Sequence, residues 1–282
     1  MSKTVLNVLL RVFLVAFFGY FAVCAAAWSL QDTLIFHPRA GLTKTPATAD
    51  LPFEDVWLTS ADGEQLHGWY IPRPESDAPH VLFFHGNAGN LGSHIYTFEV
   101  LHSLGFSVFA IDYRGYGLSS GSPTIPGAKS DAEAAWLYLT EGRRIAPSQI
   151  VLYGRSLGGG VAAALARSYQ PAAIVLESTF SNLSDMGRRR YPFLPVALLL
   201  RDELPTARIV AELRCPVMVA HSPADRVVPF DMGLGIAAAA GSRGRWVELR
   251  SSHNRAFKHS AAHYHDILGT FIRTATMKPP AP

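Results

Sequence analysis

One serine in this sequence stands where it could act as a nucleophile. Ser156 is the centre of Gly154–Gly158, a Gly-x-Ser-x-Gly pattern between the apolar run Ile150–Tyr153 and the small-residue stretch Gly159–Tyr169. The run predicts a buried strand and the stretch predicts a helix. A serine on so tight a turn has a strained backbone, and flanking glycines give the turn room. The pattern therefore favours a hydroxyl raised above a sheet edge over an ordinary glycine turn with a capping serine.

A serine hydroxyl is a poor nucleophile unless a base takes its proton and an acid orients that base. His253 and Asp225 could fill these two roles. Asp225 lies in the loop after the apolar run Val217–Ala220, and His253 lies in the loop after Trp246–Leu249. Taken singly, such an aspartate is usually solvated and such a histidine usually caps a helix. Glu177, which also ends an apolar run, is the alternative candidate for the acid.

Two backbone amides could stabilise the oxyanion that forms when a serine attacks a carbonyl group. The amide of Leu157 stands at the expected start of a helix, next to Ser156. The amide of Asn87 lies in the turn His85–Asn90, whose glycines let backbone amides face a bound anion. The alternative is that this turn only leads into the next helix. The later loop Asp112–Ser119 is interpreted as a structural wall of the site.

The elements that must position these residues alternate along the chain. Two short strands are expected around the turn Asp62-Gly63. Further apolar runs are continuous rather than alternating, which is typical of strands buried on both faces of a parallel sheet. These runs are Val81–Phe84, Phe106–Ile111, Ile150–Tyr153, Ile174–Leu176, Val217–Ala220 and Trp246–Leu249. Stretches with helical spacing separate them, so the sequence predicts an α/β sandwich of three layers.

One stretch, residues 181–213, is too long for an ordinary crossover. It contains Arg188–Arg190, Pro192, Pro195 and the apolar run Val196–Leu200. We interpret it as a small cap inserted over the carboxyl edge of the sheet, and the alternative is a longer helix that covers the sheet. The proline-rich residues 276–282 predict a flexible tail.

The first 30 residues predict a single-pass membrane anchor. Val12 to Leu30 are 19 residues without a charge, about the length that spans a bilayer core. A cleaved signal peptide and a buried soluble helix are the alternatives, but the run exceeds the usual apolar core of about 7–15 residues in signal peptides. Lys3 and Arg11 favour a cytoplasmic N-terminus and a catalytic domain outside the cytoplasm, although Arg39 and Lys44 nearly cancel this bias.

The composition excludes several other classes of protein. Hydrophobic residues make up 49% of the chain, which excludes a disordered protein. A formal net charge of +3, from 25 basic and 22 acidic residues, is too small a bias to indicate nucleic-acid binding. Cys24 and Cys215 fit neither a disulfide framework nor a zinc site. The sequence predicts no cofactor and no metal.

Five motifs together resemble the α/β-hydrolase superfamily: FFHGNAGN, AIDYRGYGLSSG, LYGRSLGGG, HSPADRVVP and SSHN. More narrowly, the chain resembles membrane-anchored serine hydrolases in which a short anchor precedes a sequence like Leu34–Pro38. The resemblance covers residues 31–275 and implies the α/β-hydrolase fold, with an eight-stranded, mostly parallel sheet and helices on both faces. The site residues that it implies are Ser156 as nucleophile, His253 as base, Asp225 as the orienting acid, and the amides of Asn87 and Leu157 as the oxyanion hole.

The leading hypothesis is a serine hydrolase that cleaves carboxylic esters, thioesters included, through an acyl-enzyme on Ser156. A peptidase or amidase with the same triad is an alternative, because His253 can protonate an amine as well as an alcohol. A noncatalytic binding module on the same fold is the third hypothesis. The expected partners are a small-molecule or lipid-like acyl ester and a membrane.

One departure from the family pattern is Ser222, where a glycine is common.

Overall fold

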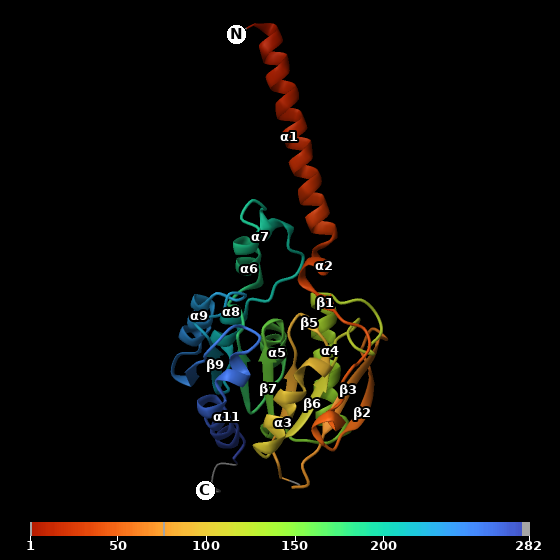
Figure 1. Ribbon diagram of the computed structural model, residues 1–282, viewed down its shortest axis with the longest axis vertical. Coiled ribbons are helices and arrows are strands. Elements are labelled where there is room, and N and C mark those ends of the chain that lie inside the picture. The colour runs from red at the N-terminus through yellow and green to blue at the C-terminus, as the bar shows by residue number, and fades with distance from the viewer. Residues whose placement is uncertain (1, 76, 278–282) are drawn as a thin grey trace.

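The computed structural model describes residues 2–75 and 77–277. These residues form an eight-stranded sheet in the order β10-β9-β8-β7-β4-β6-β3-β2, with helices on both faces and one long helix that stands away from the sheet (Figure 1). The strands of this sheet are β2 (Glu54–Thr59), β3 (Gln65–Ile71), β4 (His80–Phe84), β6 (Ser107–Ile111), β7 (Ile150–Arg155), β8 (Ala173–Glu177), β9 (Val217–His221) and β10 (Gly244–Glu248). A separate two-stranded pair joins β1 (His37–Pro38) to β5 (Ala88–Gly89).

The helices follow the strands in the order expected of an α/β protein. The α-helices are α1 (Lys3–Ser29), α2 (Gln31–Ile35), α3 (Ile95–Ser103), α4 (Ile125–Leu137), α5 (Leu157–Ser168), α6 (Leu183–Arg190), α7 (Val196–Leu199), α8 (Thr206–Glu212), α9 (Phe230–Ala240), α10 (Ala256–His259) and α11 (Ala261–Thr276). The tail predicted over 276–282 begins at the last residue of α11, and residues 278–282 lie outside the described residues.

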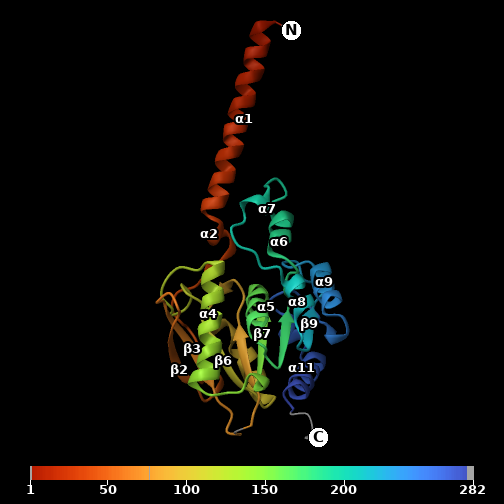
Figure 2. The same cartoon turned by 180° about the vertical axis from the view of Figure 1, so that it is seen from behind.

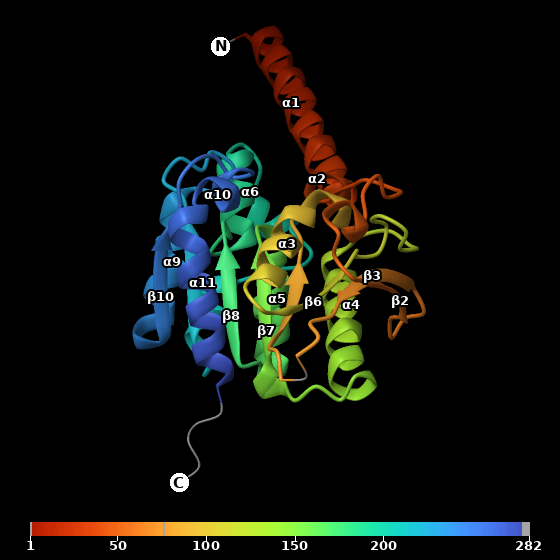
Figure 3. The ribbon, with the colours of Figure 1, turned by 60° about the horizontal axis from the view of Figure 1, so that its bottom comes forward.

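The pairing of the strands confirms the predicted fold class. β2 and β3 are antiparallel, β3 is antiparallel to β6, and every other neighbouring pair of the sheet is parallel. Alternate residues of the central strands enter two separate cores. Leu82 and Leu152 pack under α4, α5, α8 and α9 (Figure 2), and Phe83 and Tyr153 pack under α3 and α11 (Figure 3). Burial on both faces explains why these strands are continuous apolar runs.

The helix α1 is the apolar N-terminal segment of the sequence. It is 27 residues long, none of them buried, and its Ser2 cap accepts a hydrogen bond from the Val5 amide at 3.3 Å. It is long and apolar enough to cross a membrane. The helix therefore extends the run from Val12 to Leu30 toward the N-terminus and includes Arg11. It continues into α2 on the side of the sheet where the parallel strands end (Figure 1).

The segment 181–213 has two parts in the structure, one that fits the interpretation as a cap and one that covers the sheet. The part with α6 and α7 projects beyond the sheet beside the lower end of α1 (Figure 2). The hydroxyl of Tyr20 in α1 donates to the carbonyl of Phe193 at 2.9 Å, and the Gln31 amide donates to the carbonyl of Leu199 at 3.3 Å. The helix α8 instead packs on α5 and α9, as an ordinary helix of the sheet would. We refer to residues 181–205 as the cap.

Candidate active site

Ser156 lies at the junction of β7 and α5, where its backbone is strained. Its φ of 54° and ψ of −120° are a conformation that residues other than glycine rarely adopt. A Cβ atom on Gly154 would collide with the carbonyl of Gly158, and one on Gly158 would collide with the carbonyl of Phe84. The glycines on both sides of Ser156 are therefore required for close packing of α5 on β7 and β4.

Asp225 and His253 come together above the ends of β9 and β10. Nδ1 of His253 lies 2.6 Å from Oδ2 of Asp225. The other carboxylate oxygen, Oδ1, accepts hydrogen bonds from the amides of Val227 at 2.8 Å and Val228 at 2.9 Å. These amides fix the plane of the carboxylate, so Oδ2 faces the imidazole.

The carboxylate of Asp225 is ionised in this setting. Burial by itself raises the pKa of Asp225, but hydrogen bonds with His221, with His253 and with the Val228 amide outweigh burial and hold the pKa well below the ordinary value. An ionised carboxylate can only accept, so Nδ1 of His253 carries the proton that joins them. Nε2 is then left free to accept a proton from another group.

Ser222, the departure from the family pattern, ties the two loops together. Its hydroxyl donates to the carbonyl of Ser251 at 2.6 Å and accepts from the amide of Ala224 at 3.1 Å. One end of this bridge lies in the loop that carries Asp225 and the other lies in the loop that carries His253. A glycine could not make this bridge. The bridge could not be predicted from the sequence, because its acceptor is a backbone carbonyl.

Glu177, the alternative acid, has other partners. Its side chain is fully buried and accepts a hydrogen bond from the hydroxyl of Tyr153. Its Oε1 lies 3.4 Å from Nε of Arg155, and Nη2 of Arg155 donates to the carbonyl of His253 at 2.9 Å. Glu177 thus contacts the His253 loop through Arg155. Sequence reasoning missed Arg155, which joins the end of β7 to the loop that carries His253.

The turn that carries Asn87 lies against Ser156. A Cβ atom on Gly86 would be 3.4 Å from Cβ and 3.9 Å from Oγ of Ser156. The carbonyl of Gly86 accepts a hydrogen bond from Nδ1 of the fully buried His85 at 2.7 Å. Because the peptide is planar and trans, the amide of Asn87 must point away from His85. The amide of Leu157 is at the first position of α5 and adjoins the same hydroxyl.

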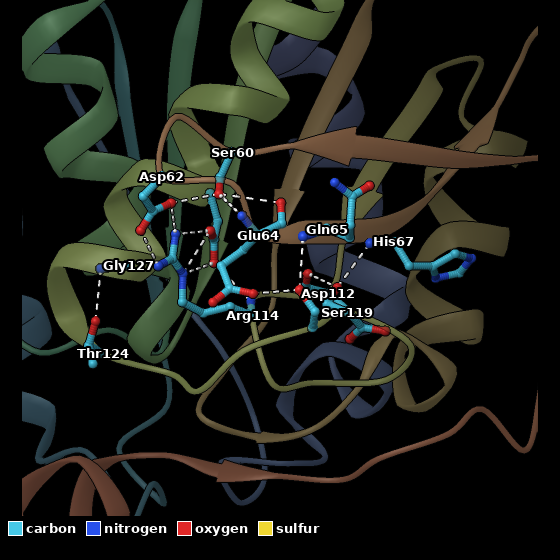
Figure 4. A network of polar contacts seen from close by, with 12 residues as sticks. Ser60, Asp62, Glu64, Gln65, His67, Asp112, Arg114, Ser119, Thr124 and Gly127 are labelled. Carbon is cyan, nitrogen blue, oxygen red and sulfur yellow. Dashed lines mark hydrogen bonds and ion pairs between the residues drawn. The ribbon is translucent and has the colours of Figure 1, made fainter.

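The loop Asp112–Ser119 has the properties expected of a structural wall. Arg114 forms ion pairs with Asp62 at 2.6 Å and with Asp131 at 2.8 Å, which join the loop to the β2–β3 turn and to α4 (Figure 4). Oδ1 of Asp112 accepts from the amide of Leu91 at 2.9 Å. The polar side chains of Asp112 and Arg114 therefore hold the loop in place.

One cavity lies away from these candidate residues. It measures about 920 Å³ and is lined by residues that include Pro147, Ala172 and Cys215, before the starts of β7, β8 and β9. This is the opposite end of the sheet from Ser156. Burial raises the pKa of the Cys215 thiol, which makes it a weak nucleophile. Within the described residues, no group of three His, Cys, Asp or Glu side chains could hold a metal ion.

Comparison with known proteins decides the family. A family model described as the alpha/beta hydrolase fold matches residues 79–210. The chain is 36% identical over 251 residues to the alpha/beta hydrolase domain-containing protein WAV2 of Arabidopsis thaliana, covering 79% of this chain and 82% of that protein. The chain belongs to the α/β-hydrolase family.

Two further similarities describe this α/β hydrolase more closely. It is 33% identical over 234 residues to a protein of Danio rerio named lysophosphatidylserine lipase ABHD12, covering 73% of this chain and 61% of the lipase. Its fold is similar to that of the esterase Pf2001 of Pyrococcus furiosus, with a TM-score of 0.72 and 20% identity over 86% of this chain and all of the esterase. The fold and these relatives support hydrolase activity.

Proposed function

We propose that this α/β hydrolase is a serine hydrolase that cleaves carboxylic esters or thioesters. The observation that carries the proposal is the pair of Asp225 and His253, joined at 2.6 Å, in the loops that end β9 and β10, together with Ser156 on its strained turn at the end of β7. Each part follows the carboxyl end of a different strand, the edge at which ligands bind in open α/β sheets. A serine on a strained strand-to-helix turn between glycines is the arrangement that exposes a nucleophilic hydroxyl above an α/β-hydrolase sheet.

In this mechanism Oγ of Ser156 attacks the acyl carbonyl carbon while Nε2 of His253 takes its proton. The carbonyl oxygen becomes an oxyanion and accepts hydrogen bonds from the amides of Asn87 and Leu157. His253 then returns the proton to the leaving alcohol or thiol, and an acyl-enzyme remains on Ser156. Water attacks the acyl-enzyme with His253 as the base. The bond between Oγ of Ser156 and the acyl carbon then breaks, His253 returns the proton to Oγ, and the carboxylic acid leaves. Asp225 stays ionised throughout and stabilises the imidazolium.

Covalent labelling tests the activated serine, and a substrate panel tests the reaction. The full chain is expected to react with a fluorophosphonate probe at Ser156, which mass spectrometry of the labelled peptide would show. A panel of esters, thioesters and amides of graded chain length should give turnover on esters and thioesters well above that on amides. Efficient amide cleavage would instead favour a peptidase or amidase, and absent labelling would favour a binding module.

We further propose that α1 anchors the protein in a membrane as a single-pass helix. Its 27 residues extend to about 40 Å at about 1.5 Å per residue, enough for a hydrocarbon core of about 30 Å. Lys3 and Arg11 favour a catalytic domain outside the cytoplasm. No residue of α1 packs into the sheet domain as a core helix would, and a signal peptide would not need the contact of Tyr20 with the cap.

The cap supports a lipid-like acyl ester as the substrate. The contact of Tyr20 with Phe193 places the tip of the cap beside the anchor helix, nine residues before its end. Phe193 and Leu198 at this tip are 63% and 84% exposed, and the neighbouring Arg188–Arg190 would suit anionic headgroups. An acyl chain could therefore pass from the membrane to the carboxyl edge of the sheet under the cap.

Replacing Phe193 and Leu198 by serine in the full chain tests this route. In vesicles that carry a long-chain acyl ester, we expect hydrolysis to fall about tenfold, since two apolar contacts with lipid are lost. Turnover of a short soluble ester should stay within about twofold. The matched control is Leu234→Ser, because Leu234 is 45% exposed on α9 and lies outside the cap. Equal losses on both substrates, or on neither, would contradict entry from the membrane.

A further inference from the structure

A short segment between the anchor and the sheet contacts the turn that carries Asn87. We name residues 35–41 the strap. Its strand β1 pairs in parallel with β5, which directly follows Asn87. The amide of His37 donates to the carbonyl of Asn87 at 2.8 Å, and the amide of Arg39 donates to the carbonyl of Gly89 at 2.9 Å. The strap therefore donates to two backbone carbonyls of the turn, those of Asn87 and Gly89.

The strap and its neighbours hold Asn87 on two sides. The side-chain amide of Asn87 donates to the carbonyl of Ile35 at 2.8 Å. Its carbonyl accepts from the hydroxyl of Tyr116 at 2.7 Å as well as from the amide of His37. With both the carbonyl and the side chain fixed, the rotation of Asn87 about its backbone is restricted. The direction of its own amide is restricted with it.

The strap itself is held firmly at both ends. Phe36 is 2% exposed in the core beneath α4 and α5. At the other end, Nδ2 of Asn90 donates to the carbonyls of Arg39 at 3.1 Å and Gly41 at 2.6 Å. The amide of Gly117 also donates to Arg39 at 3.0 Å. The strap thus lies between the turn His85–Asn90 and the wall loop, and it cannot shift without shifting both.

We propose that the strap is a positioning element of the oxyanion hole, which aims the amide of Asn87 at the carbonyl oxygen of the substrate. This inference rests on the proposed serine hydrolase function. It gives a role to the sequence Leu34–Pro38: Phe36 fixes the segment in the core and the amide of His37 holds Asn87. It also makes the segment that leaves the anchor part of the catalytic framework. An oxyanion forms only during reaction, so the strap acts on kcat rather than on KM.

Two variants of His37 in the full chain separate the effect of its backbone amide from the effect of its side chain. His37→Pro removes the amide that bonds to Asn87, whereas His37→Ala keeps the amide and removes only an exposed side chain. Phe36 has φ −105° and ψ 135°, a conformation that a residue before proline favours. We expect His37→Pro to lower kcat on a soluble ester at least tenfold with KM within about twofold, and His37→Ala to match the wild type.

A trifluoromethyl ketone adds a measurement that a merely structural role would not change. Its adduct with Ser156 carries the oxyanion, so its affinity should fall by the same factor as kcat, while the affinity for the product alcohol stays unchanged. Tyr116→Phe removes a different hydrogen bond to the same carbonyl and should lower kcat and ketone affinity together, by about threefold or more. This variant answers the question if His37→Pro does not fold.

The outcomes also separate this inference from the proposed function. If the wild type is not labelled at Ser156 by a fluorophosphonate, the proposed function fails and the strap has no oxyanion hole to position. If the wild type is labelled and active, but His37→Pro and Tyr116→Phe both keep full kcat, the strap proposal alone is overturned. A rise in KM at constant kcat would overturn it as well.

Discussion

Replacing Ser156 by alanine is expected to abolish ester hydrolysis and to leave the fold intact. Loss of the nucleophile in a serine triad lowers turnover by a factor on the order of 10⁴–10⁶. The hydroxyl of Ser156 makes no capping hydrogen bond at the start of α5, so its loss removes no support from the helix. Hydrolysis of p-nitrophenyl acetate measures the activity, and thermal unfolding followed by circular dichroism measures the stability.

Ser178 provides a matched control for this experiment. It is also a buried serine with positive φ at the end of a central strand, and its φ is 50°. The hydroxyl of Ser178 makes no hydrogen bond with Asp225 or His253. Ser178→Ala should therefore keep turnover within about twofold of the wild type. Near-normal hydrolysis by Ser156→Ala, with or without an effect of Ser178→Ala, would show that Ser156 is not the nucleophile.

The sheet and the positions of the candidate residues could be predicted because both depend on local sequence. A strand buried on both faces must be apolar at every position, and the run Ile150–Tyr153 has this property. The need for glycine on both sides of Ser156 is also local. A Cβ atom on Gly154 would collide within the turn, and one on Gly158 would collide with the neighbouring strand β4. A loop that directly follows such a strand lies at the carboxyl edge, which placed Asp225 and His253 on the same side of the sheet.

The contacts that position these residues could not be predicted, because they depend on register between distant segments. Arg155 reaches the carbonyl of His253 over 98 residues, and Ser222 reaches that of Ser251 over 29. A backbone carbonyl is present at every residue, so the acceptor leaves no mark in the sequence. The role of the strap was hidden for the same reason, since His37 acts through its amide and its side chain is exposed.

The cap shows a different limit of sequence reasoning. Apolar residues at 196–200 fit a helix that covers the sheet as well as a surface that faces lipid, because both environments exclude water. In the structure the sheet-covering role falls to α8, which ends the segment, while α7 lies beside the anchor. The deciding contact, between Tyr20 and Phe193, joins residues 173 positions apart.

Asp225→Asn is expected to lower turnover by up to about 10⁴ with little change in the fold. The amides of Val227 and Val228 donate to Oδ1 of the wild-type carboxylate, so they select the oxygen of the new asparagine at that position. Its NH₂ group must then face Nδ1 of His253. Two donors cannot bond to each other, so the neutral imidazole must place its proton on Nε2. In that tautomer His253 cannot accept a proton from Ser156.

Glu177→Gln is the comparison that assigns the acid. This change weakens the contact of Glu177 with Arg155, and through it the support of the His253 carbonyl, but it leaves the tautomer of His253 unchanged. We expect a loss of about tenfold or less in kcat, far below that of Asp225→Asn. Nitrogen NMR of the His253 ring checks the cause, since the proton should move from Nδ1 to Nε2 only in Asp225→Asn. If Glu177→Gln were crippling and Asp225→Asn nearly silent, the two carboxylates would have to exchange roles, although only Asp225 touches the imidazole.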